Sequence, residues 1–335
     1  MPCRILTRCQ KIFLSLLKIP LPHLLEYLVV LTITTGCTGF TDFESEIEPG
    51  KLRQLTYSHR GMERTYWLYI PTGLSTSGSF SASDSGQEQQ PALLTVLHGS
   101  NQSGEVMLYM GDFQVHAEKH KYVLLAPDSM GTAFNDGSNR TEPAYRKIDD
   151  TNFIVSLNRY IQSELLTNRN QNYLAGFSSG ASMAQRVVAE SEGEFSAVVS
   201  VADHYWGPET TDIPPVSMLF IFGDSDPLNP VAGGDVFHHR ELTLNTPSPG
   251  KTATYWARKM GCTTAITATV KPVKQRKWAG CNNKTNVMYL EVSNLGHFWA
   301  GGKVRSYEGM SERDVGPFHP GFITTLVMWD YLNKL

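Results

Sequence analysis

Short apolar runs alternate along the chain with longer stretches that have the hydrophobic period of a helix. The clearest apolar run is 216–222, Val-Ser-Met-Leu-Phe-Ile-Phe, and the clearest helical stretch is 181–190. A nearly continuous apolar run is typical of a strand in a parallel sheet that is covered on both faces. The expected strands lie near residues 51–58, 62–70, 92–97, 122–126, 172–176, 196–202, 216–223 and 286–293. The expected helices lie near residues 106–120, 150–166, 179–191, 248–260 and 319–333.

This alternation predicts an α/β fold with a mostly parallel eight-stranded sheet and helices on both faces. The first two expected strands follow each other closely enough to form an antiparallel hairpin. With 335 residues and 41% hydrophobic side chains, the chain is long enough to bury one large core. We therefore expect one catalytic domain over residues 50–335.

The start of the chain has the pattern of an export signal. Four basic residues precede the apolar run 27–35, which ends in small residues. A membrane-spanning helix is the alternative, but Pro20, Pro22 and Glu26 interrupt the apolar length that spanning requires. We predict that residues 1–36 are a signal peptide and that residues 37–49 are a linker.

The cysteines agree with export. Thr35-Gly36-Cys37 resembles the end of a bacterial lipobox, so Cys37 is either lipidated or simply lies beside the cleavage point. The body of the chain then keeps Cys262 and Cys281, which an oxidising compartment would join in a disulfide. We expect an extracellular or periplasmic protein, or an outer-membrane lipoprotein that meets the membrane only through its lipid anchor.

Charge excludes one class of partner. Removal of the signal would leave 25 basic and 31 acidic side chains, a net charge of −6. Nucleic acid is therefore not an expected partner, because its phosphates attract basic surfaces. The oligomeric state stays open.

A serine between two glycines follows one of the predicted buried strands. Gly176-Phe177-Ser178-Ser179-Gly180 comes directly after the run Tyr173-Leu174-Ala175 and directly before a helical stretch. A sharp turn of this kind pushes the serine hydroxyl out of the sheet edge, and flanking glycines allow close backbone contact. Ser178 is therefore the candidate nucleophile.

An acidic residue and a histidine follow later strands in the order that an α/β-hydrolase requires. Asp224 and Asp226 lie after the strand 216–223, and His297 lies after the strand 286–293. The carboxyl ends of parallel strands meet at one edge of a sheet, so these loops should converge with that of Ser178. The residues themselves leave the choice between the two aspartates open.

A fourth loop follows the strand 92–97 and reads His98-Gly99-Ser100-Asn101. It is placed for an oxyanion hole, a pair of N–H groups that stabilise the charge on the reacting carbonyl oxygen. We expect these donors to be the backbone N–H groups of Ser100 and Ser179.

Together, the four blocks resemble those of the polyhydroxybutyrate-depolymerase and feruloyl-esterase-like α/β-hydrolases, a group with secreted members. The blocks are Leu97-His98-Gly99-Ser100, Gly176 to Gly180, Gly223 to Asp226 and Gly296 to Trp299. The resemblance covers roughly residues 50–335 and implies the α/β-hydrolase fold. It also implies a Ser178, Asp226 and His297 triad, with Asp224 as a turn residue.

The resemblance implies an exported serine esterase whose substrates are polyhydroxyalkanoate oligomers or feruloyl or acetyl esters of plant polysaccharide. The chain departs from many relatives at Ser100 and Ala300, and residues 134–145 lack the Cys-Trp cluster of several polymer depolymerases. Polymer specificity therefore stays open. Aromatic and imidazole side chains near the loops are candidates for substrate binding or ordinary packing: His98, Tyr205, Trp206 and Trp299.

Other functions share parts of this pattern. A surface binding protein for polyester or polysaccharide could keep the fold without catalysis, and a peptidase or thioesterase would use the same triad. We expect no metal and no cofactor, because no Cys-x-x-Cys pair and no glycine-rich phosphate loop after a strand is present.

Overall fold

The computed structural model describes residues 47–74, 90–209, 212–238, 241–303 and 311–335. Within these ranges the main sheet has ten strands in the order β1-β2-β4-β3-β5-β6-β7-β12-β11-β10. Their bounds in chain order are β1 Leu52–His59, β2 Met62–Tyr69, β3 Ala92–Leu97, β4 Tyr122–Pro127, β5 Asn172–Phe177, β6 Ala197–Val201, β7 Ser217–Gly223, β10 Thr264–Val270, β11 Val273–Ala279 and β12 Val287–Val292. A separate two-stranded sheet pairs β8 (Gly234–His238) with β9 (Glu241–Thr246).

The centre of the main sheet is parallel. Strands β4, β3, β5, β6, β7 and β12 run in one direction. Every residue of β3 to β7 is buried, which is why these strands are nearly continuous apolar runs in the sequence. The predicted α/β architecture, with a mostly parallel sheet and the antiparallel hairpin of β1 and β2, is confirmed.

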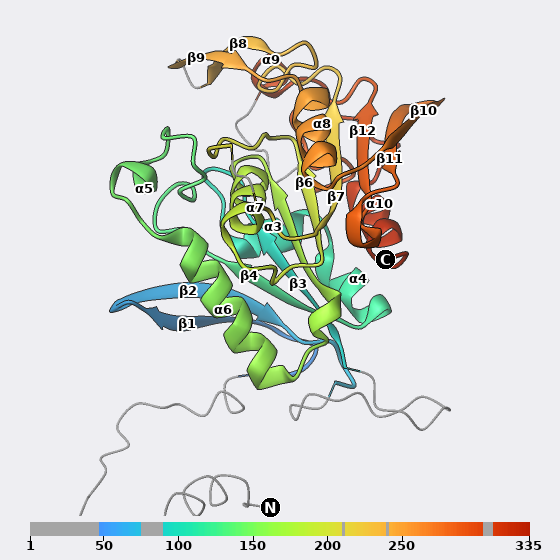
Figure 1. Cartoon of the computed structure of the whole chain (residues 1–335). Coiled ribbons are helices and arrows are strands. Elements are labelled where there is room, and N and C mark those ends of the chain that lie inside the picture. The colour runs from blue at the N-terminus through green and yellow to red at the C-terminus, as the bar shows by residue number, and fades with distance from the viewer. Residues whose placement is uncertain (1–46, 75–89, 210–211, 239–240, 304–310) are drawn as a thin grey trace, which may run out of the picture. The chain divides into compact units, whose positions relative to one another are not determined.

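Helices cover both faces of the sheet (Figure 1). Helices α6 (Asp150–Leu165), α7 (Ser179–Glu190) and α8 (Pro249–Lys259) contribute to one apolar cluster. Helices α3 (Gly104–Met110), α4 (Phe113–His120) and α10 (Thr324–Leu332) contribute to the other. Two short helices, α5 (Glu142–Tyr145) and α9 (Glu312–Val315), lie in loops. Single turns of 3-10 helix lie at Arg169–Gln171 and Asn282–Lys284.

The sheet is wider than the eight strands expected from the sequence. The additional strands, β10 and β11, form an antiparallel hairpin that pairs with β12 and places β10 at the sheet edge (Figure 1). All seven residues of β10 are exposed, so the strand lacks the apolar pattern by which the other strands are recognised.

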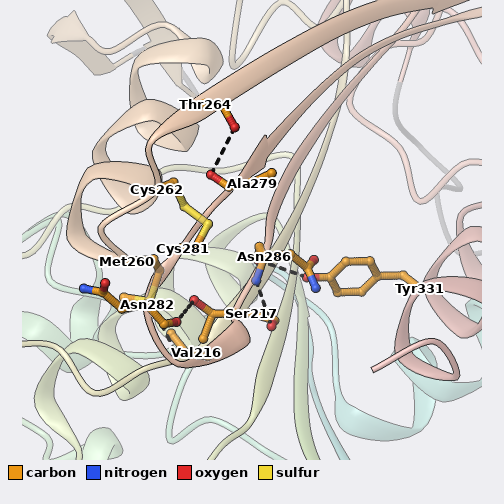
Figure 2. Close-up of a disulfide and its surroundings, with 11 residues drawn as sticks. Val216, Ser217, Met260, Cys262, Thr264, Ala279, Cys281, Asn282, Asn286 and Tyr331 are labelled. Carbon is orange, nitrogen blue, oxygen red and sulfur yellow. Dashed lines mark hydrogen bonds between the residues drawn. A yellow bond between two sulfur atoms is a disulfide. The ribbon is translucent and has the colours of Figure 1, made fainter.

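The predicted bridge between Cys262 and Cys281 is present in the structure. It joins the residues just outside the Thr264 and Ala279 pair, so it closes the open end of the β10–β11 hairpin (Figure 2). The Asn282 N–H donates to the Met260 carbonyl beside it, at 2.8 Å. The bridge therefore ties the end of α8 to the start of β12 across the hairpin.

The described residues all belong to one compact unit, Thr41–Leu335. The predicted signal peptide, 1–36, the Cys37 position and most of the predicted linker lie outside the described residues. No helix in the described part of the chain combines the length and the apolar character needed to cross a membrane.

Candidate active site

Ser178 lies at the sharp turn between β5 and α7. Its backbone has φ 52° and ψ −128°, a conformation that residues other than glycine rarely adopt. Two glycines make the turn possible. A Cβ on Gly176 would come within 2.1 Å of the Gly180 oxygen, and a Cβ on Gly180 would come within 2.3 Å of the Leu97 oxygen. The sequence pattern around Ser178 therefore reflects backbone contacts that only glycine allows.

Three predicted residues meet at the carboxyl ends of their strands. The Ser178 hydroxyl lies 2.8 Å from His297 Nε2, and Asp226 Oδ2 lies 2.8 Å from His297 Nδ1. Asp226 and His297 are buried, whereas Ser178 is partly exposed. The distances suit a base that takes the serine proton and a carboxylate that fixes the opposite ring nitrogen.

The two candidate aspartates have different surroundings. Asp226 Oδ1 accepts the backbone N–H groups of Leu228 and Asn229, at 2.8 and 3.0 Å, so the carboxylate is held while Oδ2 faces the imidazole. Asp224 is exposed, and its Oδ1 accepts the Ser225 hydroxyl and the Asn294 N–H. Asp224 is thus a turn residue in this structure, as the resemblance implied.

Electrostatics at His297 favour the charged imidazole. Burial by itself lowers the pKa of a histidine, because it disfavours the charged form. Here the charge and hydrogen bond of Asp226, with a further contribution from Asp203, outweigh burial and raise the pKa of His297 above its ordinary value. An imidazolium at this position is therefore stabilised relative to the neutral ring.

The loop after β3 lies against the start of α7. The Ser100 hydroxyl donates to Ser179 Oγ over 3.1 Å, and the Asn101 N–H donates to the Thr132 carbonyl. Ser179 is the first residue of α7, where a backbone N–H has no acceptor within the helix. The two loops expected to form the oxyanion hole are therefore adjacent.

Two of the four suggested substrate-binding residues are fully buried. His98 receives the Ser129 N–H on Nε2, and its Nδ1 faces the Gly99 carbonyl, so both ring nitrogens are used within the loops. Trp299 donates its indole N–H to Thr325 and packs on Phe113. Neither side chain has surface to offer a ligand, which corrects the suggestion made from the sequence.

The other two, Tyr205 and Trp206, are partly exposed. Tyr205 stacks on Tyr255 and donates its hydroxyl to the Pro208 carbonyl. The Trp206 indole N–H donates to Asp203, and the Arg140 guanidinium lies 4.3 Å from the centre of its ring. Both remain candidates for the rim of a substrate site.

Two polar residues near Ser178, Asp226 and His297 were not predicted from the sequence. Asn229 donates its side-chain amide to the Ala202 carbonyl and so ties the Asp226 loop to the end of β6. Asp203, buried two residues after β6, contributes to the charge felt by His297. The rule that functional groups collect at the carboxyl ends of parallel strands could have identified Asp203.

A histidine pair at metal-ligand spacing also escaped the sequence analysis. His116 and His120 stand four residues apart on α4, but their rings stack on each other and on Trp329. Among the residues that the structure describes, no group of three or more His, Cys, Asp or Glu side chains is placed to hold a metal ion.

Comparisons with known proteins agree with this fold. No family model matches the chain. The chain is 30% identical over 171 residues to the protein named "Putative esterase NocK" of Nocardia uniformis subsp. tsuyamanensis, a match that covers 48% of this chain and 45% of that protein. It is 21% identical over 182 residues to acetylxylan esterase A of Emericella nidulans, covering 53% and 55%. The chain thus spans about half the length of these curated relatives.

The fold has a counterpart among solved structures. Acetyl xylan esterase from Aspergillus awamori superposes with a TM-score of 0.53 at 14% identity, covering 74% of this chain and 94% of that one. At such low identity the likeness establishes the architecture only. The chain therefore has the α/β-hydrolase fold and resembles a group of esterases that includes acetylxylan esterases, as its four sequence blocks predicted.

Proposed function

We propose that this chain is a serine carboxylic-ester hydrolase in which Ser178 is the nucleophile, His297 the general base and acid, and Asp226 the residue that orients the imidazole. The observation that carries the proposal is the hydrogen-bonded series from Ser178 through His297 to Asp226, with both distances at 2.8 Å. The named esterases among the relatives support the same reaction class.

The geometry supports a two-step mechanism. As Ser178 Oγ bonds to the carbonyl carbon, its proton passes to His297 Nε2, and the carbonyl oxygen takes up an electron pair. The backbone N–H groups of Ser100 and Ser179 stabilise that oxyanion. His297 then gives the proton to the leaving alcohol, and water repeats the attack on the acyl-enzyme to release the acid.

For the substrate, we propose a short acyl ester, with acetyl groups on a polysaccharide as the first candidate. The acetylxylan esterases among the relatives favour this class over feruloyl esters and polyhydroxyalkanoate oligomers. A screen of purified protein against acetylated xylan, methyl ferulate, polyhydroxybutyrate and p-nitrophenyl esters of increasing acyl length tests it. Faster hydrolysis of long acyl chains or of polyhydroxybutyrate would contradict the acetyl assignment.

We also propose that the protein is exported. The basic and apolar pattern of residues 1–36 and the Cys262–Cys281 bridge support this location. Mass spectrometry of the protein recovered from the envelope or medium should find a mature chain that begins near Cys37. An added diacylglycerol mass on Cys37 identifies a lipoprotein, and an intact Met1 would refute export through a cleaved signal.

Labelling with a fluorophosphonate probe tests the nucleophile and separates an esterase from a binding protein. We expect the wild type to be labelled and Ser178→Ala to be unlabelled, with kcat on p-nitrophenyl acetate reduced by up to about 10⁶. Ser179→Ala is the matched control, because it keeps its backbone N–H and should retain most of the activity. If Ser179→Ala is the inactive variant, Ser178 is not the nucleophile, and if the wild type is neither labelled nor active, the chain is a binding protein.

A further inference from the structure

One continuous segment of this acidic chain carries only positive charge. Residues 249–284 contain eight Lys and Arg side chains and no Asp or Glu, whereas the rest of the chain has 21 basic and 32 acidic side chains. The segment consists of α8, the β10–β11 hairpin and the turn that follows it, and the Cys262–Cys281 bridge joins these parts. We call the eight side chains the basic patch: Lys251, Arg258, Lys259, Lys271, Lys274, Arg276, Lys277 and Lys284.

Most of the basic patch is exposed and is not neutralised by the protein itself. Six of its side chains are exposed, and the other two are half-buried. Ion pairs join Arg258 to Glu209 and Lys274 to Glu291. Five members form no ion pair with another residue that the structure describes: Lys251, Lys271, Arg276, Lys277 and Lys284. A cluster of cations of this kind attracts a polyanion, although the whole chain is acidic.

The hairpin reaches the edge of the sheet at which the candidate active site lies. Strand β11 runs antiparallel to β12 with Val273 opposite Val292, so the turn between β10 and β11 lies at the carboxyl end of β12 (Figure 1). There the Ser293 N–H, in the loop that carries His297, donates to the Pro272 carbonyl at 2.8 Å.

Three members of the basic patch follow one another away from this turn. Lys271 lies in the turn itself, and Lys274 and Arg276 lie on β11. A strand advances about 3.3 Å per residue, so the row from Lys271 to Arg276 is about 17 Å long. A polymer bound along this row can therefore extend to the loop that carries His297.

The face of the hairpin with Lys274 and Arg276 combines cations with hydroxyl groups. Directly opposite residues of antiparallel strands share a face, and these two residues lie opposite Thr269 and Thr267 of β10. The Arg276 guanidinium lies 4.6 Å from the centre of the Trp278 ring, a contact that restricts its orientation. This face thus offers charged donors and threonine hydroxyls side by side.

The other face of the hairpin has a different character. It carries Lys277 opposite Ile266, and Val270 lies on the same side of β10. Ile266 is 68% exposed and Val270 is 77% exposed. Surfaces that bind lipid place apolar side chains in the membrane interface and add electrostatic attraction. The face with Lys274 and Arg276 has hydroxyl groups in place of such apolar side chains, which favours a hydroxylated anionic polymer over a membrane.

We propose that the basic patch binds a polysaccharide that bears carboxylate groups, as uronic acid units do, and holds it beside the candidate active site. Guanidinium and ammonium groups form charge-assisted hydrogen bonds with carboxylates. Threonine hydroxyls donate to and accept from sugar hydroxyls. The inference goes beyond the proposed esterase function, because this binding needs neither Ser178 nor turnover.

Binding of a fluorescently labelled oligogalacturonate, followed by anisotropy, tests the proposal on the full-length protein. We expect the wild type to bind this probe and not labelled dextran, a neutral polysaccharide. Raising NaCl from about 0.02 M to about 0.3 M should weaken binding at least about tenfold, because salt screens exposed charges. Lys271→Gln/Lys274→Gln/Arg276→Gln should raise Kd about tenfold at low salt, since each exposed ion pair contributes modestly.

Lys51→Gln/Arg53→Gln/Lys119→Gln is the matched control. It removes the same number of positive charges from exposed positions outside the basic patch, two of them beside or within β1 at the opposite edge of the sheet. We expect it to bind the oligogalacturonate as the wild type does. An equal loss of affinity in this control would overturn the proposal, because net charge rather than the patch would then determine binding.

Three other results would overturn the assignment: no binding of oligogalacturonate by the wild type, equal binding of dextran, or tighter binding of phosphatidylglycerol vesicles or duplex DNA. If the triple variant of the patch does not fold by circular dichroism, Lys271→Gln/Lys274→Gln should raise Kd about three- to fivefold. Ser178→Ala should bind as the wild type does. Intact binding in a protein without esterase activity would therefore refute the proposed function and leave this inference standing.

Discussion

At the scale of single residues, the proposed triad depends on differences between side chains that look alike in the sequence. Asp224 and Asp226 are separated by one residue, yet only Asp226 is buried with an oxygen on the imidazole. The turn after β7 leaves Asp224 exposed and buries Asp226, and backbone N–H groups fix each carboxylate. Register within that turn therefore decides which aspartate can act on His297.

Asn substitutions at the two positions test this difference. Asp226→Asn should keep the fold but favour the wrong imidazole tautomer, which costs on the order of 10⁴ in kcat. Asp224→Asn keeps an oxygen that can accept the Asn294 N–H, so we expect a loss below about tenfold. Steady-state kinetics on one activated ester, with circular dichroism as the folding control, makes the comparison. Equal losses, or a larger loss at Asp224, would contradict the assignment.

At the scale of elements, the sequence predicts those helices and strands whose burial produces a regular hydrophobic pattern. It does not predict elements that lack such a pattern. The buried strands β3 to β7 were located correctly, and the three loops expected to converge do meet, because apolar runs and glycine contacts constrain the residues there. The helix expected at 106–120 is divided into α3 and α4 by Gly111 and by Asp112, which has φ 51°. The β10–β11 hairpin was missed since β10 has no buried side.

Proximity to a motif also led to wrong predictions of substrate-binding residues. His98 and Trp299 each belong to a block proposed to carry chemistry, but both are buried: His98 accepts the Ser129 N–H, and Trp299 donates to Thr325 in α10. Their positions in the blocks reflect support for the loops. Asp203 was missed for the opposite reason, because no glycine or motif marks the end of β6.

The disulfide joins two elements and should contribute measurably to the stability of the fold. Closing the hairpin by the Cys262–Cys281 bridge should stabilise the fold by about 3 kcal/mol on the chain-entropy estimate. Thermal unfolding followed by circular dichroism should therefore show a lower Tm for Cys262→Ser/Cys281→Ser than for the oxidised wild type. Reduced wild type is the control and should match the double variant. Two free thiols in the non-reduced protein after alkylation and mass analysis would remove the basis of this expectation.

At the scale of the whole molecule, the site is built by neighbouring parallel strands. Ser178 follows β5, Asp203 follows β6, Asp226 follows β7 and His297 follows β12, and these four strands are adjacent in the sheet. The order of strands in the sheet therefore brings together residues that are up to 119 positions apart in the chain. Spatial adjacency of this kind depends on the whole fold rather than on any local segment.

The pH dependence of the proposed activity follows from that assembly. His297 must be neutral to accept the Ser178 proton, and its pKa is raised above the ordinary value of 6.5. The acid side of the kcat/KM profile should therefore have its midpoint above pH 6.5, with activity lost as pH falls through it. Initial rates on a neutral ester between pH 5 and about 9 measure the midpoint. A midpoint below 6.5 would contradict the electrostatic description of the site.

The outer edge of the sheet has a consequence for the protein in concentrated solution. Strand β10 is exposed along its whole length and has the sequence Thr-Ala-Ile-Thr-Ala-Thr-Val, without a charge or a proline to discourage strand pairing. Unprotected edges of this kind are templates for aggregation. We expect particle size in light scattering to grow with protein concentration, and Thr267→Lys to suppress that growth while leaving the melting temperature unchanged. The tendency of this chain to aggregate would then reside in one seven-residue strand, and a single lysine would improve its solubility.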